Sequence, residues 1–193
     1  MKGLLIAFEG LDQSGKQTQA ELLRDRLTDA GRKVKLLSFP DYQTAIGSEI
    51  GRALRGERDY SADVMQLLYV ANRYEVKGDI IRAKEAGTIL VCDRYVASSI
   101  AYGQAQGLDK AWLRDIQKYL PPPDLTILLD IPPEVSATRK TADRDKYERD
   151  LVLLARVRES YLSQAGDGWL RLDGNRDRDV VAADVQAAVL AMM

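Results

Sequence analysis

The stretch FEGLDQSGKQTQ, which runs from Phe8 to Gln19, joins the end of an apolar segment to a glycine-rich turn and a lysine. The residues from Gly10 to Lys16 have the spacing G-x-x-x-x-G-K, between a strand-like segment and a helical pattern, as that motif requires. The glycines let backbone N–H groups turn inward around a phosphate, and the helix N-terminus adds a partial positive charge. The stretch therefore predicts a phosphate-binding loop, in which Lys16 reaches the outer phosphate oxygens of a nucleotide. The residues that we expect to contact the nucleotide here are Gly10, Leu11, Asp12, Gln13, Ser14, Gly15, Lys16, Gln17 and Thr18.

Five short apolar segments alternate with helical patterns along the chain. The apolar segments are LLIAFE (4–9), KVKLLSF (33–39), TILVCD (88–93), DLTILLDI (124–131) and WLRLD (169–173). The helical patterns cover 17–29, 61–86, 108–119, 147–164 and 179–192. This alternation indicates βαβ units around a parallel sheet that is buried on both faces. We therefore predict an α/β fold, a three-layer sandwich in which helices flank a parallel sheet of about five strands, with ligands at the carboxyl ends of the strands.

Size and composition fit one domain, 1–193, and exclude several kinds of site. Of the 193 residues, 46% are hydrophobic and 30% are charged, an ordinary balance for a globular protein. A net charge of -1 and a pI of about 5.6 give no global basic surface for nucleic acid. The absence of histidine excludes His-based triads, and the single cysteine, Cys92, excludes an internal disulfide. The first apolar segment is too short to span a membrane, so we expect a cytoplasmic protein with no membrane partner.

Gln17 departs from the phosphate-loop pattern, because the residue after the lysine is normally Ser or Thr, whose hydroxyl faces Mg²⁺. Two interpretations remain open. Either Gln17 contacts the metal through its amide oxygen or a water molecule, or nucleotide phosphates, water and Asp93 hold the metal. We favour the second, because Mg²⁺ usually keeps several waters. Thr18 is no substitute, since helical geometry turns it about 100° from the preceding position.

Charged residues follow two of the predicted strands. Glu9 and Asp12 lie beside the expected polyphosphate, which is unfavourable unless a cation or an arginine intervenes. Asp93 would project from the end of its strand toward the phosphate loop. Arg94, the next residue, can clamp a phosphate in bidentate fashion. These positions predict a second group of phosphate-binding side chains near the loop.

Two further segments carry candidate ligand contacts. Tyr69 and Arg73 are four residues apart on one face of the long helical pattern, so they could stack on and hydrogen-bond a base; the alternative is a solvated helix face. The segment TRKTADRDKYERD (138–150) is rich in both charges. It is either a solvated loop or a basic lid, about 139–148, that closes over transferring phosphate.

Together these segments resemble thymidylate kinases, within the P-loop nucleoside-monophosphate kinases, in order along nearly the whole chain. The phosphate loop is similar to the family's F-E-G-x-D-x-x-G-K-[ST]-T-Q. The other segments that carry the resemblance are FPDY (39–42), LLYVANRYE (67–75), DRYVASSIAYG (93–103), LPPPDLTILLDIPPEVSATR (120–139) and DKYERDLVLLARVRESYL (145–162). The resemblance implies a P-loop NTPase fold with a short lid, ATP and dTMP as substrates, Mg²⁺ as cofactor and a homodimer.

The resemblance also implies a role for individual residues. Tyr69 would stack on thymine, Arg73 would hydrogen-bond the base edge, and Tyr102 would crowd the 2′ position of the sugar. The implied catalytic residues are Lys16, Asp12, Arg94 and Arg144. Arg139 would join the phosphate loop in binding ATP, and Asp93, with Gln17, would lie at the metal. The implied dTMP site consists of Asp12, Phe39, Tyr42, Tyr69, Arg73, Arg94, Ser98, Ser99 and Tyr102.

Some positions depart from the family pattern, and alternatives follow from them. Gln13 and Ser14 offer no arginine in the loop, and Lys146 stands where the lid segment has Arg. The lid is then the expected source of positive charge in the transition state. The nearest alternative is a kinase of the same fold for another deoxynucleotide or a deoxynucleoside. Gln17 best supports a second alternative, a weakly catalytic nucleotide-binding protein or P-loop switch, and an inactive scaffold is a third.

Overall fold

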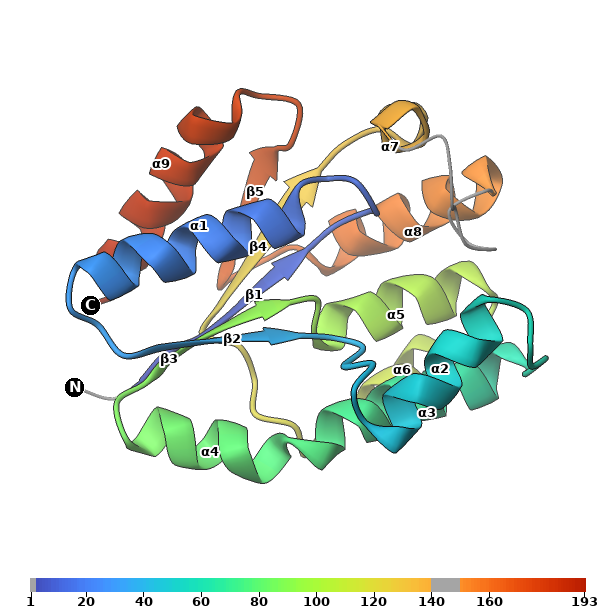
Figure 1. Cartoon of the computed structure of the whole chain (residues 1–193). Coiled ribbons are helices and arrows are strands. Elements are labelled where there is room, and N and C mark those ends of the chain that lie inside the picture. Colours follow the sequence, from blue (N-terminus) through green and yellow to red (C-terminus); the bar gives the residue numbers. More distant parts are fainter. Residues whose placement is uncertain (1–2, 140–149) are drawn as a thin grey trace.

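The fold is a five-stranded parallel sheet with helices on both faces (Figure 1), in a computed structural model that describes residues 3–139 and 150–193. The strands are β1 (Leu5–Glu9), β2 (Val34–Ser38), β3 (Ile89–Asp93), β4 (Leu125–Asp130) and β5 (Trp169–Asp173), in the order β2-β3-β1-β4-β5. All neighbouring strands pair in parallel. All five strands that the sequence predicts are therefore present, and the predicted fold class is confirmed.

Two layers of helices bury the sheet. One face of the sheet is covered by α1 (Lys16–Asp29) and α9 (Arg178–Leu190). Their apolar side chains share a core cluster with Ile6, Phe8 and Ile127 of the sheet. The other face is covered by α4 (Lys77–Glu85), α5 (Val96–Ala105) and α8 (Leu151–Gln164). Every residue of β1 and β4 is buried, which explains why these strands are continuous apolar runs without alternation.

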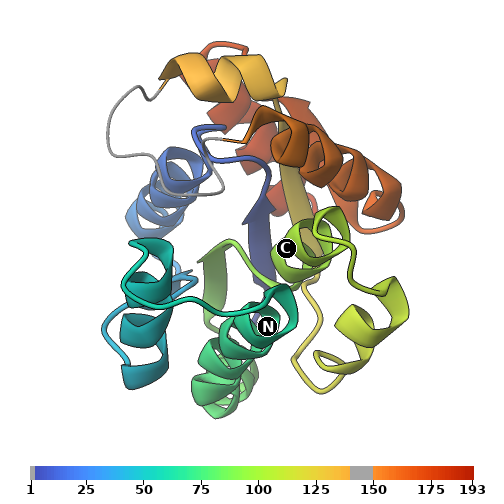
Figure 2. The same cartoon turned by 90° about the vertical axis from the view of Figure 1, so that its right-hand side faces the viewer.

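The sheet order brings two functional segments together. Strand β1 pairs with β3, and Phe8 lies opposite Asp93 at their carboxyl ends. The loop after β1 and the loop after β3 therefore leave the sheet side by side. Figure 2 views the molecule from the side toward which the strands point, where these loops and α2 (Ala45–Leu54) and α3 (Ala62–Glu75) surround the end of the sheet. This is the edge where parallel α/β sheets bind ligands.

Some helix boundaries differ from the prediction. The single helix expected over 61–86 is two helices, α3 and α4, because Val76 leaves the helical conformation with φ -104 and ψ 5. The break lets α4 turn along the sheet, where Ile80 joins the core with partly buried Val76. The helix expected over 108–119 is shorter, α6 (Lys110–Asp115). The short α2, the apolar α5 and the seven-residue α7 (Pro133–Arg139) are not among the predicted helical patterns, although α2 has a clear amphipathic period that the prediction missed.

The single domain and the lid over about 139–148 stay predictions. Of the lid, only Arg139 lies within the described residues, whereas Arg144 and Lys146 lie outside them. In the described ranges, no helix combines the length and the apolar character that a membrane span needs.

Ile127 offers a test of the core. Its side chain is fully buried in β4, between the sheet neighbours β1 and β5. We expect Ile127→Ala to lower the free energy of unfolding by about 2–5 kcal/mol, because it removes buried methylenes and leaves a cavity. Urea unfolding measures the change. Val152→Ala, at a position with 65% exposure, is the matched control and should change stability by about 0.5 kcal/mol or less. Equal effects of the two substitutions would contradict this description of the core.

Candidate active site

The phosphate loop is held open by backbone conformations that glycine permits. Gly10 has φ +140, and a Cβ on it would lie 2.4 Å from the Leu129 carbonyl oxygen, so no side chain fits there. Gly15 has φ +96 and precedes α1, and Gln13 also has a positive φ of 61. Lys16 begins α1 and folds back over the loop, where its Nζ donates to the Leu11 carbonyl oxygen at 2.7 Å. The loop thus has the strained, inward-turned backbone that a phosphate cradle requires.

Burial changes the proton affinity of Lys16. Its side chain is only 5% exposed. Burial and the neighbouring Arg94 lower the pKa of Lys16 from 10.5 to about 8, although Asp12, Asp93 and Glu9 oppose the shift. An ammonium group whose charge is poorly compensated is well suited to bind a polyanion.

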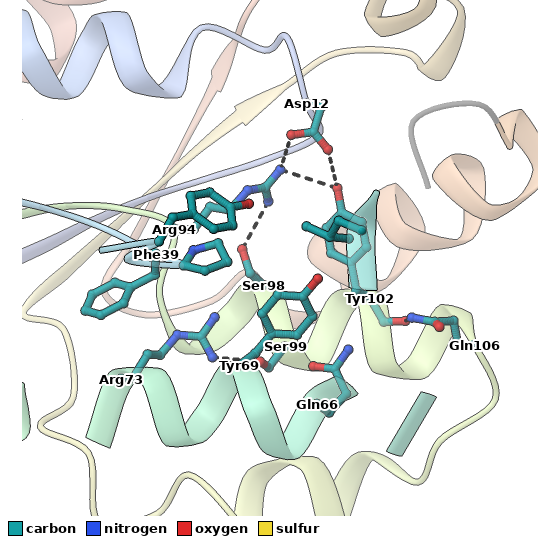
Figure 3. Close-up of a pocket in the computed structure, with 13 residues that line it drawn as sticks. Asp12, Phe39, Gln66, Tyr69, Arg73, Arg94, Ser98, Ser99, Tyr102 and Gln106 are labelled. Atoms are coloured by element: carbon teal, nitrogen blue, oxygen red, sulfur yellow. Dashed lines mark hydrogen bonds and ion pairs between the residues drawn. The ribbon is translucent and has the colours of Figure 1, made fainter. Parts of the chain in front are cut away.

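Arg94 is the centre of the second phosphate-binding group. Its backbone has φ 64, unusual for a residue with a side chain, and its N–H donates to the Phe8 carbonyl oxygen at 2.9 Å. One guanidinium nitrogen bonds Asp12 at 2.6 Å, and the other donates to the Gly10 carbonyl oxygen and to Ser98 Oγ, both at 3.2 Å. Figure 3 shows this cluster at the top of the pocket. The strained backbone therefore aims the guanidinium at the phosphate loop.

Electrostatics hold Asp12 in its ionised form. Burial alone would raise the pKa of this carboxyl, but Arg94 and Lys16 outweigh burial and hold it well below its usual range. Tyr102 adds a hydrogen bond from its hydroxyl to Asp12 at 2.9 Å. The acidic residue inside the loop is thus paired with an arginine, one of the two partners that the sequence predicts for it.

Glu9 has a structural role that the sequence does not reveal. It is fully buried at the end of β1 and accepts hydrogen bonds from the Tyr95 N–H at 2.9 Å and the Ser98 hydroxyl at 2.5 Å. It also accepts from the hydroxyl of Tyr161, in α8, at 3.2 Å. Tyr95 and Ser98 lie at the N-terminus of α5, where a carboxylate is favoured. Glu9 therefore fixes the start of α5 instead of pairing with an arginine as Asp12 does.

A pocket opens beside this cluster, over α3 and α5. Its empty space is about 570 Å³, which includes open solvent at its mouth. Figure 3 shows Arg94 and Asp12 at one end and Arg73 at the other, with Tyr69 between them. The lining residues are Asp12, Phe39, Pro40, Tyr42, Leu54, Gln66, Tyr69, Arg73, Arg94, Ser98, Ser99, Tyr102 and Gln106.

Arg73 is a buried cation with neutral hydrogen-bond partners in the described part of the chain. Its side chain is 3% exposed, and Nη1 donates to Ser99 Oγ at 2.7 Å and to Gln117 Oε1 at 3.4 Å. Nε has no partner among the described residues. The guanidinium lies 5.9 Å from the ring centroid of Phe39. Burial lowers the pKa of Arg73. Such a desolvated group is costly in the free protein and available to a ligand.

Asn72, next to Arg73, anchors the turn that follows β2. Its Oδ1 accepts from the Asp41 N–H at 2.8 Å, and its Nδ2 donates to Thr44 Oγ1 at 2.9 Å. Helix α3 therefore holds the segment that brings Phe39 and Tyr42 to the pocket. The sequence predicts a ligand-facing stripe on this helix but not this second, buried polar anchor.

The candidate metal-binding residues differ in their surroundings. Asp93 Oδ1 is buried and has no hydrogen-bond partner in the described ranges, so this carboxylate is available beside the phosphate loop. Gln17 is exposed and donates from its amide to Glu21 at 2.9 Å, and Thr18 is exposed as well. Across residues 3–139 and 150–193, no three Cys or acidic side chains gather into a metal site. Asp93 is therefore the candidate that best fits a cation held largely by phosphates and water.

Arg139 reaches the phosphate loop from the end of α7. It donates to the Gln13 carbonyl oxygen at 3.0 Å and to the Gly174 carbonyl oxygen and Asn175 Oδ1 at 3.0 and 3.1 Å. The segment after β5 thus borders the phosphate loop, and no sequence pattern indicates that contact.

Nine residues predicted for the acceptor site all line one pocket. They come from four segments that are far apart in the sequence: Asp12, Phe39, Tyr42, Tyr69, Arg73, Arg94, Ser98, Ser99 and Tyr102. The prediction missed Pro40, Leu54, Gln66 and Gln106. A signal existed for Gln66, since it lies three residues before Tyr69 on the same helical stripe.

Comparison with known proteins places the chain in a family. The family model described as Thymidylate kinase matches residues 8–185. A thymidylate kinase from Schizosaccharomyces pombe is 40% identical over 148 residues, 77% of this chain and 70% of that protein. One from Plasmodium falciparum is 35% identical over 186 residues, 95% and 88% of the two chains. The solved structure of the Candida albicans thymidylate kinase superposes with a TM-score of 0.88 at 32% identity, covering 98% of this chain and 92% of that one. The chain therefore belongs to the thymidylate kinase family.

Proposed function

We propose that the pocket over α3 and α5 binds dTMP and that the phosphate loop binds the ATP that phosphorylates it. As a member of its family, the chain is an ATP-dependent nucleoside-monophosphate kinase that forms dTDP and ADP. The assignment of residues to the two substrates is our proposal. It is carried by one observation: the half-buried guanidinium of Arg94 and the buried guanidinium of Arg73 lie at opposite ends of one pocket, with Arg94 bonded to the phosphate loop.

The acceptor would lie with its phosphate at Arg94 and its base at Arg73. Arg94 offers a planar fork that suits a phosphate, and exchange of its Asp12 contact for phosphate oxygens keeps the guanidinium paired. Tyr69 provides an aromatic face and Arg73, supported by Ser99, provides donors for a base carbonyl. Tyr102 lies at the Arg94 end, where its hydroxyl donates to Asp12 at 2.9 Å, and it would crowd a 2′-hydroxyl of the sugar next to the bound phosphate.

The transfer requires that the two substrates are held in line and that the charge of the transition state is stabilised. It requires no covalent intermediate. An oxygen of the acceptor phosphate attacks the γ-phosphorus of ATP, and the bond from that phosphorus to the β–γ bridging oxygen breaks as ADP leaves. Lys16 and the loop N–H groups hold the transferring phosphate, while Arg94 holds the acceptor in line. No histidine base is needed, because the acceptor is already an anion at neutral pH. Arg144, in the proposed lid, would add positive charge in the transition state.

Mg²⁺ would be held by Asp93 together with nucleotide phosphates and water. When bound, it neutralises charge on the β- and γ-phosphates. Asp93 Oδ1, which has no partner within residues 3–139 and 150–193, supports this assignment more than the exposed amide of Gln17 does. A location in the cytoplasm remains our expectation from the sequence.

The proposed function is tested by an ADP-release assay with ATP and Mg²⁺ that compares dTMP, dUMP, dCMP, dGMP, ribothymidine monophosphate and thymidine as acceptors. We expect a strong preference for dTMP. Turnover with a different acceptor would leave the assigned fold unchanged and would show that the pocket is specific for that acceptor instead of dTMP. Slow, acceptor-independent hydrolysis would favour the nucleotide-switch alternative that Gln17 suggests, and would overturn the proposed transfer.

Arg73 should affect the acceptor and not ATP. We expect Arg73→Met to raise the KM for dTMP about 10- to 100-fold, because a charge-assisted hydrogen bond to the base is lost. The KM for ATP should stay unchanged, since ATP binds at the other side of Arg94. Steady-state kinetics with each substrate varied measure the two values. The control is Arg24→Ala, which removes an exposed arginine on α1 and should leave both KM values unchanged. Equal rises in both KM values would contradict the placement of the base.

The lowered pKa of Lys16 predicts a pH dependence. In the free protein Lys16 is charged at neutral pH and loses its proton as the pH rises through about 8. We therefore expect kcat/KM for ATP, which reports on the free enzyme, to fall above about pH 8. The kcat should fall only at higher pH, because bound phosphates favour the charged lysine. Initial rates with ATP varied across this range measure both values, at a low fixed dTMP concentration for kcat/KM and at saturating dTMP for kcat, and a kcat/KM that stays flat would contradict the prediction.

We also propose a homodimer that packs through α3. Val64 and Leu67 are 37% and 47% exposed on this helix, away from the pocket face. Exposed apolar side chains on a helix whose other face forms the site are suited to a two-fold contact. We expect Leu67→Arg to convert the dimer to a monomer, as measured by light scattering, whereas Val180→Arg, on an exposed position of α9, should not. A monomeric wild-type protein would contradict the proposal.

A further inference from the structure

Gln66 is the least satisfied polar side chain of the pocket. The residue is fully buried, and neither Nε2 nor Oε1 has a hydrogen-bond partner among the described residues. It nevertheless lines the acceptor pocket, one helical turn before Tyr69 on α3 (Figure 3). A buried amide without partners costs free energy in the free protein, so its retention in a pocket points to a ligand.

The base end of the pocket also needs a hydrogen-bond acceptor for the N–H of a pyrimidine ring. A thymine ring has one N–H flanked by two carbonyl oxygens. Arg73 can only donate, and Ser99 Oγ already accepts the Arg73 Nη1 proton at 2.7 Å. Gln117 Oε1 also faces Arg73, at 3.4 Å. Ser99 Oγ therefore keeps one lone pair, whereas Gln66 Oε1 is a buried pocket acceptor with no partner among the described residues, and Nε2 beside it is a donor.

From this arrangement we infer that Gln66 determines specificity for the pyrimidine. Oε1 accepts the ring N–H and Nε2 donates to a neighbouring ring carbonyl oxygen, directly or through one water molecule. A Gln amide presents a donor and an acceptor side by side, as this edge of the ring requires. The inference rests on the proposed function, because it takes the pocket as the dTMP site.

The test compares wild-type protein with Gln66→Met, which keeps the volume of the side chain and removes its hydrogen-bonding groups. We expect the KM for dTMP to rise about tenfold, the effect of one or two hydrogen bonds, and the KM for ATP to stay the same. The inhibition constant of deoxyribose 5-phosphate, which has no base, should not change. The melting temperature of the ligand-free protein should stay the same or rise, because two unsatisfied polar atoms are removed.

Gln104→Met is the matched control. Gln104 lies on α5 outside the pocket and accepts from Ser160 Oγ at 2.8 Å, so this substitution should leave the KM for dTMP unchanged and slightly lower the melting temperature. An unchanged KM for dTMP in Gln66→Met would overturn the inference about Gln66. The proposed function would still stand if the wild-type protein phosphorylated dTMP. A clearly lower melting temperature of ligand-free Gln66→Met would also overturn it, because the amide would then be bonded within the free protein. Equal weakening of dTMP and deoxyribose 5-phosphate would overturn the assignment to the base.

Discussion

The parallel pairing of β1 with β3 is the constraint on which the site depends. It places the phosphate loop and Arg94 on adjacent strand ends, although 78 positions of sequence, from Lys16 to Arg94, separate the two groups. Backbone hydrogen bonds hold the two loops next to each other without any side-chain contact. One of them runs from the Arg94 N–H to the Phe8 carbonyl oxygen. The Asp12–Arg94 ion pair, at 2.6 Å, then joins the two loops across the gap. The Arg94 end of the pocket is therefore built on two inner strands of the sheet, β1 and β3.

The site stores unfavourable electrostatics in the free protein. Lys16 and Arg73 are both buried, and burial lowers the pKa of each. Asp93 and Arg73 each leave a buried polar atom without a partner in the described ranges. A phosphorylated nucleotide and its metal ion would supply the missing partners. Binding free energy would thus come partly from relief of a cost that the fold maintains.

Helix α3 carries both the proposed base-binding residues and the proposed subunit contact. One stripe carries Gln66, Tyr69 and Arg73 into the pocket, while Asn72 holds the turn after β2. The opposite side exposes Leu67. The break at Val76 ends this helix and lets α4 pack against the sheet, so the orientation of the stripe is fixed by the core beneath α4. A subunit contact on the outer face of α3 would therefore involve the same helix that carries the proposed base-binding residues.

The sequence by itself determined the five strands, the phosphate loop and the family resemblance. These are local features: continuous apolar runs, glycine spacing and motif order can be read without knowing which segments meet. Only the tertiary structure decided how Glu9, Asp12 and Asp93 divide their roles, because their partners come from distant loops and helices. Glu9 fixes α5, Asp12 pairs with Arg94, and Asp93 keeps one oxygen without a partner in the part of the chain that the structure describes. Burial of Gln66 likewise depends on three-dimensional packing, since an amide at that position has the same sequence signal whether it is solvated or enclosed.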